Sequence, residues 1–137
     1  MSADWFFDTN ILIYAMTPAD RRSARAESLL QQGGLISVQV LNEFANVAHR
    51  KLKRSWPEII DALDGLRILF PRPQPIGTAE HEVALTLARR YGFGFYDSLI
   101  IASALKAGCQ TLWSEDMHNG QVIDGQLAIR NPFSSDW

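Results

Sequence analysis

The chain has 137 residues, of which 47% are hydrophobic and 20% are charged. This size and hydrophobic content suit one compact core, so we expect a single domain over residues 1–137. The formal net charge of −2 excludes a polycation that gathers on nucleic acid through overall charge alone.

Cysteine content and hydropathy limit the environments in which the protein can work. Cys109 is the single cysteine, which excludes an internal disulfide and a cysteine-rich zinc site. No apolar run approaches the ~20 residues that a membrane span needs. The first residues also lack the basic start and apolar stretch of a signal peptide. We therefore expect a cytoplasmic protein.

The N-terminal part of the sequence predicts a buried strand followed by helices. Trp5–Phe7 is a short aromatic run typical of a strand, and it ends at Asp8–Asn10, which favour turns and helix caps. A helix over 21–32 and a brief strand at Leu35–Ile36 follow. Ser37 can cap the next helix, whose apolar residues recur at three- and four-residue intervals: Val40, Leu41, Phe44, Val47, Ala48 and Leu52.

Helices and a proline-rich break make up the middle of the chain. Pro57 suits the first turn of a helix, and the prolines of 71–75 predict a loop or an edge strand. A further helix is expected over 78–90, ended by Gly92. The helix predicted over 98–107 is apolar on almost every side, which is typical of a helix packed deep in a domain.

Strands return toward the C-terminus. Gln110–Trp113 is a second candidate for a central strand. Val122–Ile123 and Leu127–Ile129 are expected to be short strands joined by a hairpin turn at Asp124-Gly125.

Strands that alternate with helices predict an α/β fold with a mainly parallel central sheet flanked by helices on both faces. In such sheets, ligands bind beyond the carboxyl ends of the strands. Asp8 and Asp116 both follow a predicted strand, so we expect them at this edge although they are far apart in the sequence.

Four acidic residues adjoin predicted buried segments: Asp8, Glu43, Asp97 and Asp116. Taken alone, Asp8 and Asp97 can be helix caps, and Asp116 can belong to a turn. Glu43 lies beside the apolar stripe of its helix, and neither residue 46 nor residue 47 is a base that could pair with it. Together, four carboxylates near a core repel one another unless a cation neutralises them.

The donor chemistry favours Mg²⁺ or Mn²⁺ as that cation. These ions bind carboxylate oxygens and keep waters that a substrate phosphate can displace. Zinc more often recruits closely spaced His and Cys ligands, whereas His49, His81 and His118 are far apart in the sequence. A divalent ion lowers the pKa of its bound water, so phosphodiester cleavage at such a site needs no covalent nucleophile.

Four segments match a known family in order and spacing: Phe7–Leu12, Val40–Phe44, Tyr96–Ala104 and Leu112–Asp116. They resemble PIN-domain ribonucleases, and the likeness covers nearly the whole chain. The sequence looks most similar to the VapC-type toxins of toxin–antitoxin pairs. This resemblance implies a PIN-like three-layer α/β fold and a metal-dependent endoribonuclease that hydrolyses RNA.

The resemblance also implies a role for individual residues. The catalytic and metal-binding positions correspond to Asp8, Glu43, Asp97 and Asp116. The small polar residues that support the site correspond to Thr9, Asn10 and Ser114. Glu115 stands where Asn is usual and His118 where some members have a further Asp, so the number of metal ions, one or two, stays open.

The partners implied by the resemblance are an RNA substrate, a cognate antitoxin protein and a second copy of the chain in a homodimer. Positive charge for RNA is available in two clusters, although a solvated helix face is the more common role of such runs: Arg21, Arg22 and Arg25, then Arg50, Lys51, Lys53 and Arg54.

Other functions stay open at this point. An aspartyl-phosphate phosphatase also places Asp after a strand, but it needs a second Asp where Asn10 stands. A metal-free ribonuclease needs paired histidines, for which only His49 and His118 are near the acidic segments in sequence. A PIN-like module that binds RNA or protein without cleaving it is expected to lack the acidic residues, and all four are present.

Overall fold

The computed structural model describes residues 4–134, which form six helices and a four-stranded sheet. The helices are α1 (Thr9–Ala15), α2 (Ser23–Gln31), α3 (Val38–Arg50), α4 (Trp56–Leu69), α5 (Thr78–Tyr91) and α6 (Phe95–Lys106). The strands are β1 (Trp5–Phe7), β2 (Thr111–Trp113), β3 (Val122–Ile123) and β4 (Leu127–Arg130).

The sheet is mainly parallel, as predicted, with the strand order β1-β2-β4-β3. β2 pairs in parallel with both β1 and β4, and β3 joins β4 as an antiparallel hairpin. Asp124 and Gly125 turn this hairpin with φ angles of 50° and 65°. The Gln126 amide donates to the Ile123 carbonyl at 2.9 Å, so residues 123–126 form a turn whose two central residues both have positive φ. Because Ile123 pairs with Leu127, three residues connect the strands.

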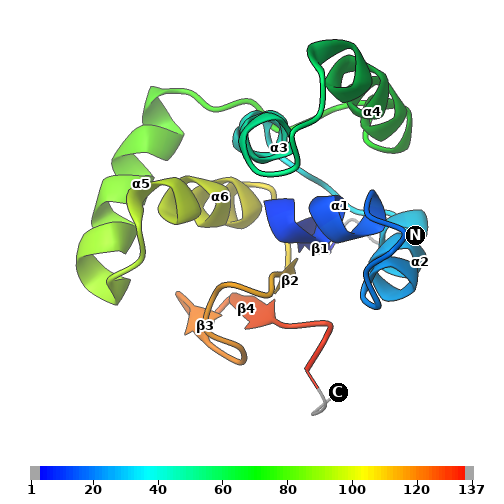
Figure 1. The fold of residues 1–137 in the computed structure, drawn as a ribbon. Helices are drawn as coiled ribbons and strands as arrows, with labels where there is room; N and C mark the ends of the chain where they lie inside the picture. The colour runs from blue at the N-terminus through cyan, green and yellow to red at the C-terminus, as the bar shows by residue number, and fades with distance from the viewer. Residues whose placement is uncertain (1–3, 135–137) are drawn as a thin grey trace.

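Helices pack around this sheet and around each other (Figure 1). α3 packs against both α1 and α6, and α5 packs along α6. The α6 residues Ile100, Ile101 and Ala104 are fully buried, so the prediction of a deeply packed helix is confirmed. No helix within residues 4–134 is long and apolar enough to cross a membrane.

Three predicted boundaries were wrong. α6 begins at Phe95 and not at 98, because Gly94 takes the N-cap position, so Asp97 lies inside the first turn. Leu35 forms a single bridge with Phe6 and no strand, because α3 begins three residues later. The helix predicted from residue 21 begins at Ser23.

Candidate active site

The carboxyl ends of β1 and β2 bring two distant polar residues together. Phe7 pairs with Trp113 in the parallel register, so the residues that follow them are neighbours. The Asp8 amide donates to the Trp113 carbonyl at 3.0 Å, and the Ser114 Oγ donates to Asp8 Oδ2 at 2.6 Å. The strand ends therefore fix Asp8 at the edge of the sheet where the sequence predicted it.

The Asp8 carboxylate is buried and also caps α1. Its Oδ1 accepts a hydrogen bond from the Thr9 amide at 2.7 Å, and only 3% of the residue is exposed. Burial raises the pKa of Asp8 to about 7, against the opposing effect of its hydrogen bonds from Ser114 and Thr9. The negative charges of Asp97 and Glu43 raise it further. A proton or a cation therefore binds favourably at this carboxylate.

Glu43 reaches the same region from α3. The cap predicted at Ser37 is present, since its Oγ accepts from the Val40 amide at 3.3 Å, and Glu43 follows on the second turn. Gln39 Nε2 donates to Glu43 Oε2 at 3.0 Å, and Thr9 Oγ1 donates to Oε1 at 3.4 Å. Both donors are neutral, so these bonds orient the half-buried carboxylate without compensating its charge.

Asp97 and Asp116 complete the acidic set. Asp97 is half-buried in the first turn of α6, and Asp116 is exposed in the loop after β2. Partial burial raises the pKa of Asp97, and the charges of Glu43 and Asp116 add to the rise. The carboxylates are thus close enough to repel one another.

One cavity of about 280 Å³ collects these side chains. Its lining residues come from α1, α3 and α6 and from the segments that follow β1 and β2. Figure 1 shows these three helices next to one another. Its lining includes all four predicted acidic residues, the predicted supporting residues Thr9 and Asn10, and the cation Lys51: Asp8, Thr9, Asn10, Ile13, Tyr14, Glu43, Val47, Lys51, Asp97 and Asp116.

The predicted supporting residues contact the acidic ones directly. Asn10 Nδ2 donates to Asp8 Oδ2 at 3.2 Å, and Asn10 Oδ1 accepts from the Glu115 amide at 3.1 Å. Ser114 lies behind Asp8, fully buried, and its Oγ also accepts from the Met117 amide at 3.3 Å. These bonds connect α1 to the loop that carries Asp116.

A second connection between α1 and this loop was missed by the sequence reasoning. Glu115 is half-buried, and its carboxylate accepts from the Tyr14 hydroxyl. Arg22 donates to the same carboxylate at 2.9 Å, and its guanidinium lies 4.0 Å from the centre of the Tyr14 ring. Arg22 and Glu115 are 93 residues apart, so no local pattern could have indicated the pair.

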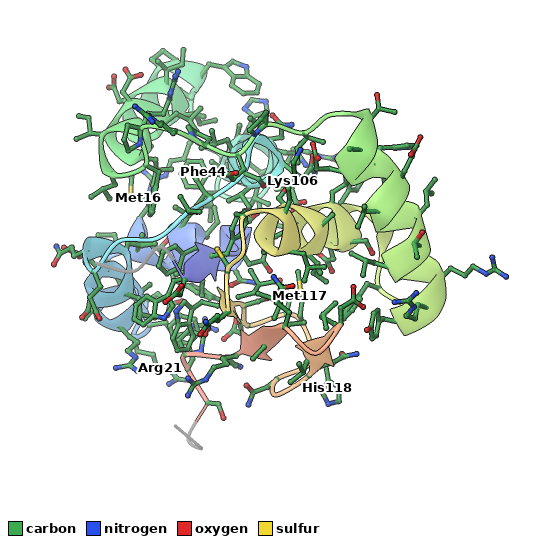
Figure 2. All side chains as sticks on the ribbon, turned by 180° about the vertical axis from the view of Figure 1, so that it is seen from behind. Met16, Arg21, Phe44, Lys106, Met117 and His118 are labelled. Carbon is green, nitrogen blue, oxygen red and sulfur yellow. The ribbon has the colours of Figure 1, made fainter. Side chains whose placement is uncertain are left out.

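The histidines do not form a catalytic pair. His118 lies beside the β3–β4 hairpin, far from Phe44 of α3 (Figure 2), in a hollow that it shares with Tyr91. His49 lies in a separate hollow at the end of α3. Neither residue lines the acidic cavity, so the metal-free mechanism with paired histidines finds no support.

The donor set fits a hydrated divalent cation. Over residues 4–134, no three His, Cys, Asp or Glu side chains stand close enough together to hold a metal ion by direct contact alone. Mg²⁺ does not require such a cage, because it keeps several waters and uses one or two carboxylates directly. A cavity lined by four carboxylates, with Asp8 held at a raised pKa, offers that chemistry.

Comparison with solved structures identifies the same fold in three toxin–antitoxin proteins. VapC20 of Mycobacterium tuberculosis, a sarcin-ricin loop cleaving toxin, has a TM-score of 0.68 and 21% identity over 82% of this chain and 89% of its own. A toxin–antitoxin complex from Klebsiella pneumoniae gives 0.69 and 21%, over 93% of this chain and 97% of its own. VapBC2 of Rickettsia felis, bound to a DNA fragment from its promoter, gives 0.68 and 20% over the same shares.

Sequence comparison points to one family. No curated protein matches the sequence. The PIN domain family, however, matches residues 5–119, which include β1, β2, all six helices and the four acidic residues. The chain belongs to the PIN domain family.

Proposed function

We propose that this protein is a metal-dependent endoribonuclease that hydrolyses RNA phosphodiester bonds and acts as the toxin of a toxin–antitoxin pair. The observation that carries the proposal is the convergence on one cavity of four carboxylates, which come from the residue after β1, from α3, from α6 and from the loop after β2. Burial makes the charge of Asp8 unfavourable, and such perturbed groups in a cavity are typical of functional sites.

The similar structures support both halves of the proposal. VapC20 is a sarcin-ricin loop cleaving toxin. The other two are a toxin–antitoxin complex and a VapBC2 assembly. The family match adds support because it spans every residue that we assign to the site.

Each residue of the site has a distinct part in the proposed reaction. Asp8, Glu43 and Asp97 would hold a hydrated Mg²⁺ or Mn²⁺, partly through its bound waters, with the exposed Asp116 also lining the cavity. When bound, the ion supplies a water of lowered pKa and neutralises charge on the scissile phosphate. The chain itself orients the carboxylates: Ser114 and Asn10 fix Asp8, whereas Thr9 and Gln39 fix Glu43. Lys51 provides a positive charge beside them for the phosphate.

The direct test is metal-dependent cleavage of RNA. Purified protein, freed of any bound inhibitor, should cleave a labelled single-stranded RNA with Mg²⁺ or Mn²⁺. EDTA should abolish the cleavage, and excess Mg²⁺ should restore it. Full cleavage in EDTA would exclude the metal mechanism, and the absence of cleavage under every metal condition would favour a non-cleaving binding module.

A neighbouring apolar hollow supports an antitoxin partner. It has a volume of about 280 Å³ between α1, α3 and α4 and includes Met16 and Phe44, which lie near each other in Figure 2. Ile13 lines both this hollow and the acidic cavity. An antitoxin segment can therefore place apolar side chains in the hollow and an Arg or Lys against the carboxylates, where charge-assisted hydrogen bonds form.

Competition with metal tests this mode of inhibition. A basic side chain and Mg²⁺ would neutralise the same carboxylates, so inhibition by the cognate antitoxin should weaken as the Mg²⁺ concentration rises. Replacing the inserted base of the antitoxin with Ala should weaken it further. Inhibition that is insensitive to both changes would place the antitoxin elsewhere on the protein.

A further inference from the structure

A series of adjoining hollows leads from the end of α3 to the acidic cavity. The outermost is lined by His49, Arg50, Lys53 and Arg54. The next is lined by Asn46, Val47, Arg50 and Lys51, so the two share Arg50. Val47 and Lys51 in turn line the acidic cavity. We call the two outer hollows the basic strip; because its inner hollow shares Val47 and Lys51 with the acidic cavity, the strip adjoins the carboxylates.

The backbone after α3 holds the basic strip in shape. The Arg54 amide donates to the Ala48 carbonyl at 3.0 Å, which folds the chain back against the last turn of the helix. Lys53 makes this reversal with a φ of 56°, a left-handed conformation that is uncommon for a residue other than glycine. Arg50 is therefore presented by the last turn of α3, and Lys53 by a backbone segment that is hydrogen-bonded to that turn.

An exposed aromatic pair stands at the outer end of the basic strip. Trp56, the first residue of α4, stacks on His49 with ring centroids 4.0 Å apart and planes 19° from parallel. Even so, 53% of Trp56 remains exposed, although it is the largest kind of apolar side chain. Exposed aromatic rings beside cations are what proteins use to stack the bases of single-stranded nucleic acid.

The helix dipole explains only part of this arrangement. Cations at the C-terminus of α3 also stabilise the helix, which accounts for the sign of Arg50 and Lys51. The helix dipole does not account for the exposed, stacked pair of rings. It also does not account for positively charged hollows that adjoin a negatively charged cavity. Because the whole chain has a net charge of −2, the positive charge needed to bind phosphates has to be gathered locally.

We propose that the basic strip binds the single-stranded RNA substrate, with a base stacked on the Trp56–His49 pair. Phosphates on the way to the carboxylates would contact Arg50, Lys51 and Lys53. This inference rests on the proposed function, since it assigns the path by which RNA reaches that site. Stacking requires an unpaired base, so the strip selects single strands over duplexes.

Binding of RNA to Trp56 variants tests the stacking. The Asp97→Asn protein, kept in EDTA so that RNA stays intact, is titrated with a fluorescent single-stranded RNA and with the matching duplex. Adding Trp56→Ala should weaken single-strand binding at least about fivefold, while Trp56→Phe should retain most of it. Duplex binding should change little. Thermal unfolding of each variant checks that the fold is kept. If Trp56→Ala proves unstable, the comparison of Trp56→Phe with the unsubstituted Trp56 protein decides the test.

Salt dependence tests the phosphate contacts. A plot of log affinity against log salt concentration should become shallower by about 1.4 in the Arg50→Gln/Lys53→Gln double variant, because each phosphate contact on a single strand contributes about 0.7. The matched control is Arg67→Gln/Arg89→Gln, which removes the same charge from exposed positions on α4 and α5 outside the strip. The slope for this control variant should equal the slope for the protein without the two substitutions.

The outcomes separate this inference from the proposed function. If the wild-type protein cleaves RNA, but RNA binding is unchanged in the Trp56→Ala and Arg50→Gln/Lys53→Gln variants, the basic strip is not the RNA-binding surface. The proposed nuclease activity would then still stand. Weakened antitoxin inhibition with unchanged RNA binding would overturn the RNA-binding role of the strip as well, because the strip would then serve a protein. Specific loss of single-strand binding supports the strip even if wild-type protein cleaves no RNA, in which case the proposed nuclease alone fails.

Discussion

Asp8 combines two roles that the sequence presented as alternatives. Its carboxylate caps α1 through the Thr9 amide, and the same carboxylate lines the acidic cavity. The cap and the Ser114 hydroxyl hold the side chain in place through the fold itself. A cation therefore binds a carboxylate that is already positioned. The free-energy cost of burying this carboxylate is part of the folded state before any ligand binds.

The first prediction concerns the pH dependence of stability without metal. The pKa of Asp8 is raised from 3.8 to about 7 on folding, so the folded state binds this proton more tightly than the unfolded state. Its contribution to stability is full below pH 3.8 and is lost as pH rises through about 7. In EDTA, the free energy of unfolding should fall by on the order of a few kcal/mol between pH 5 and pH 8.

The control for this prediction is Asp8→Asn, which cannot ionise. This variant should flatten the decline and raise the melting temperature at pH 8 relative to wild type. Saturating Mg²⁺ should also flatten the decline in the wild-type protein. A wild-type decline that persists unchanged in Asp8→Asn would assign the pH dependence to another group.

Asp116 should matter less than the other carboxylates. It is the exposed member of the set, whereas Asp8 is buried and Glu43 and Asp97 are half-buried. We expect Asp116→Asn to keep measurable cleavage but to need more Mg²⁺ for half-maximal rate, by roughly tenfold. A metal titration identical to that of wild type would reduce Asp116 to a residue of the loop.

At the scale of elements, the loop after β2 depends on its attachment to α1. Glu115 accepts from Tyr14 and Arg22, and its amide donates to Asn10. Removing the charge with Glu115→Gln weakens the Arg22 contact, so we expect the melting temperature to fall by a few degrees and the Mg²⁺ requirement for cleavage to rise. The shared cause is a loop that no longer holds Asp116 at the cavity.

The control for Glu115→Gln removes one charge from a more exposed ion pair. Glu58 pairs with Arg54 at 3.6 Å, and both side chains are at least half exposed. Glu58→Gln should leave the melting temperature and the Mg²⁺ requirement close to those of wild type. Equal effects of the two variants would show that the Glu115 contacts do not position the loop.

Local patterns predicted the elements whose signals are local. Ser37 and the spacing of Val40, Phe44 and Val47 indicated α3, and the structure confirms both the cap and the helix. The start of α6 was missed because Gly94, which caps it, also reads as a breaker. The Arg22–Glu115 contact could not be predicted, since it depends on tertiary packing that no short segment encodes.

Pairing in the sheet explains why two distant acidic residues could be predicted to meet. Asp8 and Asp116 each follow an apolar strand, and the carboxyl ends of parallel strands lie at one edge. Glu43 and Asp97 lie on helices, where the direction of a side chain depends on how α3 and α6 pack. The sequence placed both residues beside buried segments, and the family resemblance implied their role at a common site; the structure brings all four into one cavity.

At the scale of the whole molecule, exposed apolar residues favour self-association. Several large apolar side chains on α4 and α5 are exposed, and Ile68 is 81% exposed. Such surface on a small domain is typical of an interface between copies. We predict a homodimer, which light scattering at micromolar concentration should detect. A wild-type monomer under those conditions would contradict the prediction. The single domain expected over residues 1–137 also stays a prediction.

The role of the four carboxylates in cleavage is tested by the single-turnover rate of RNA cleavage at saturating Mg²⁺, measured in carboxylate variants that remain folded. Asp8→Asn, Glu43→Gln and Asp97→Asn each remove a proposed ligand and also relieve repulsion among neighbouring charges. We expect melting temperatures no lower than that of wild type, with rates reduced by at least about 100-fold. Wild-type rates in all three folded variants would contradict it.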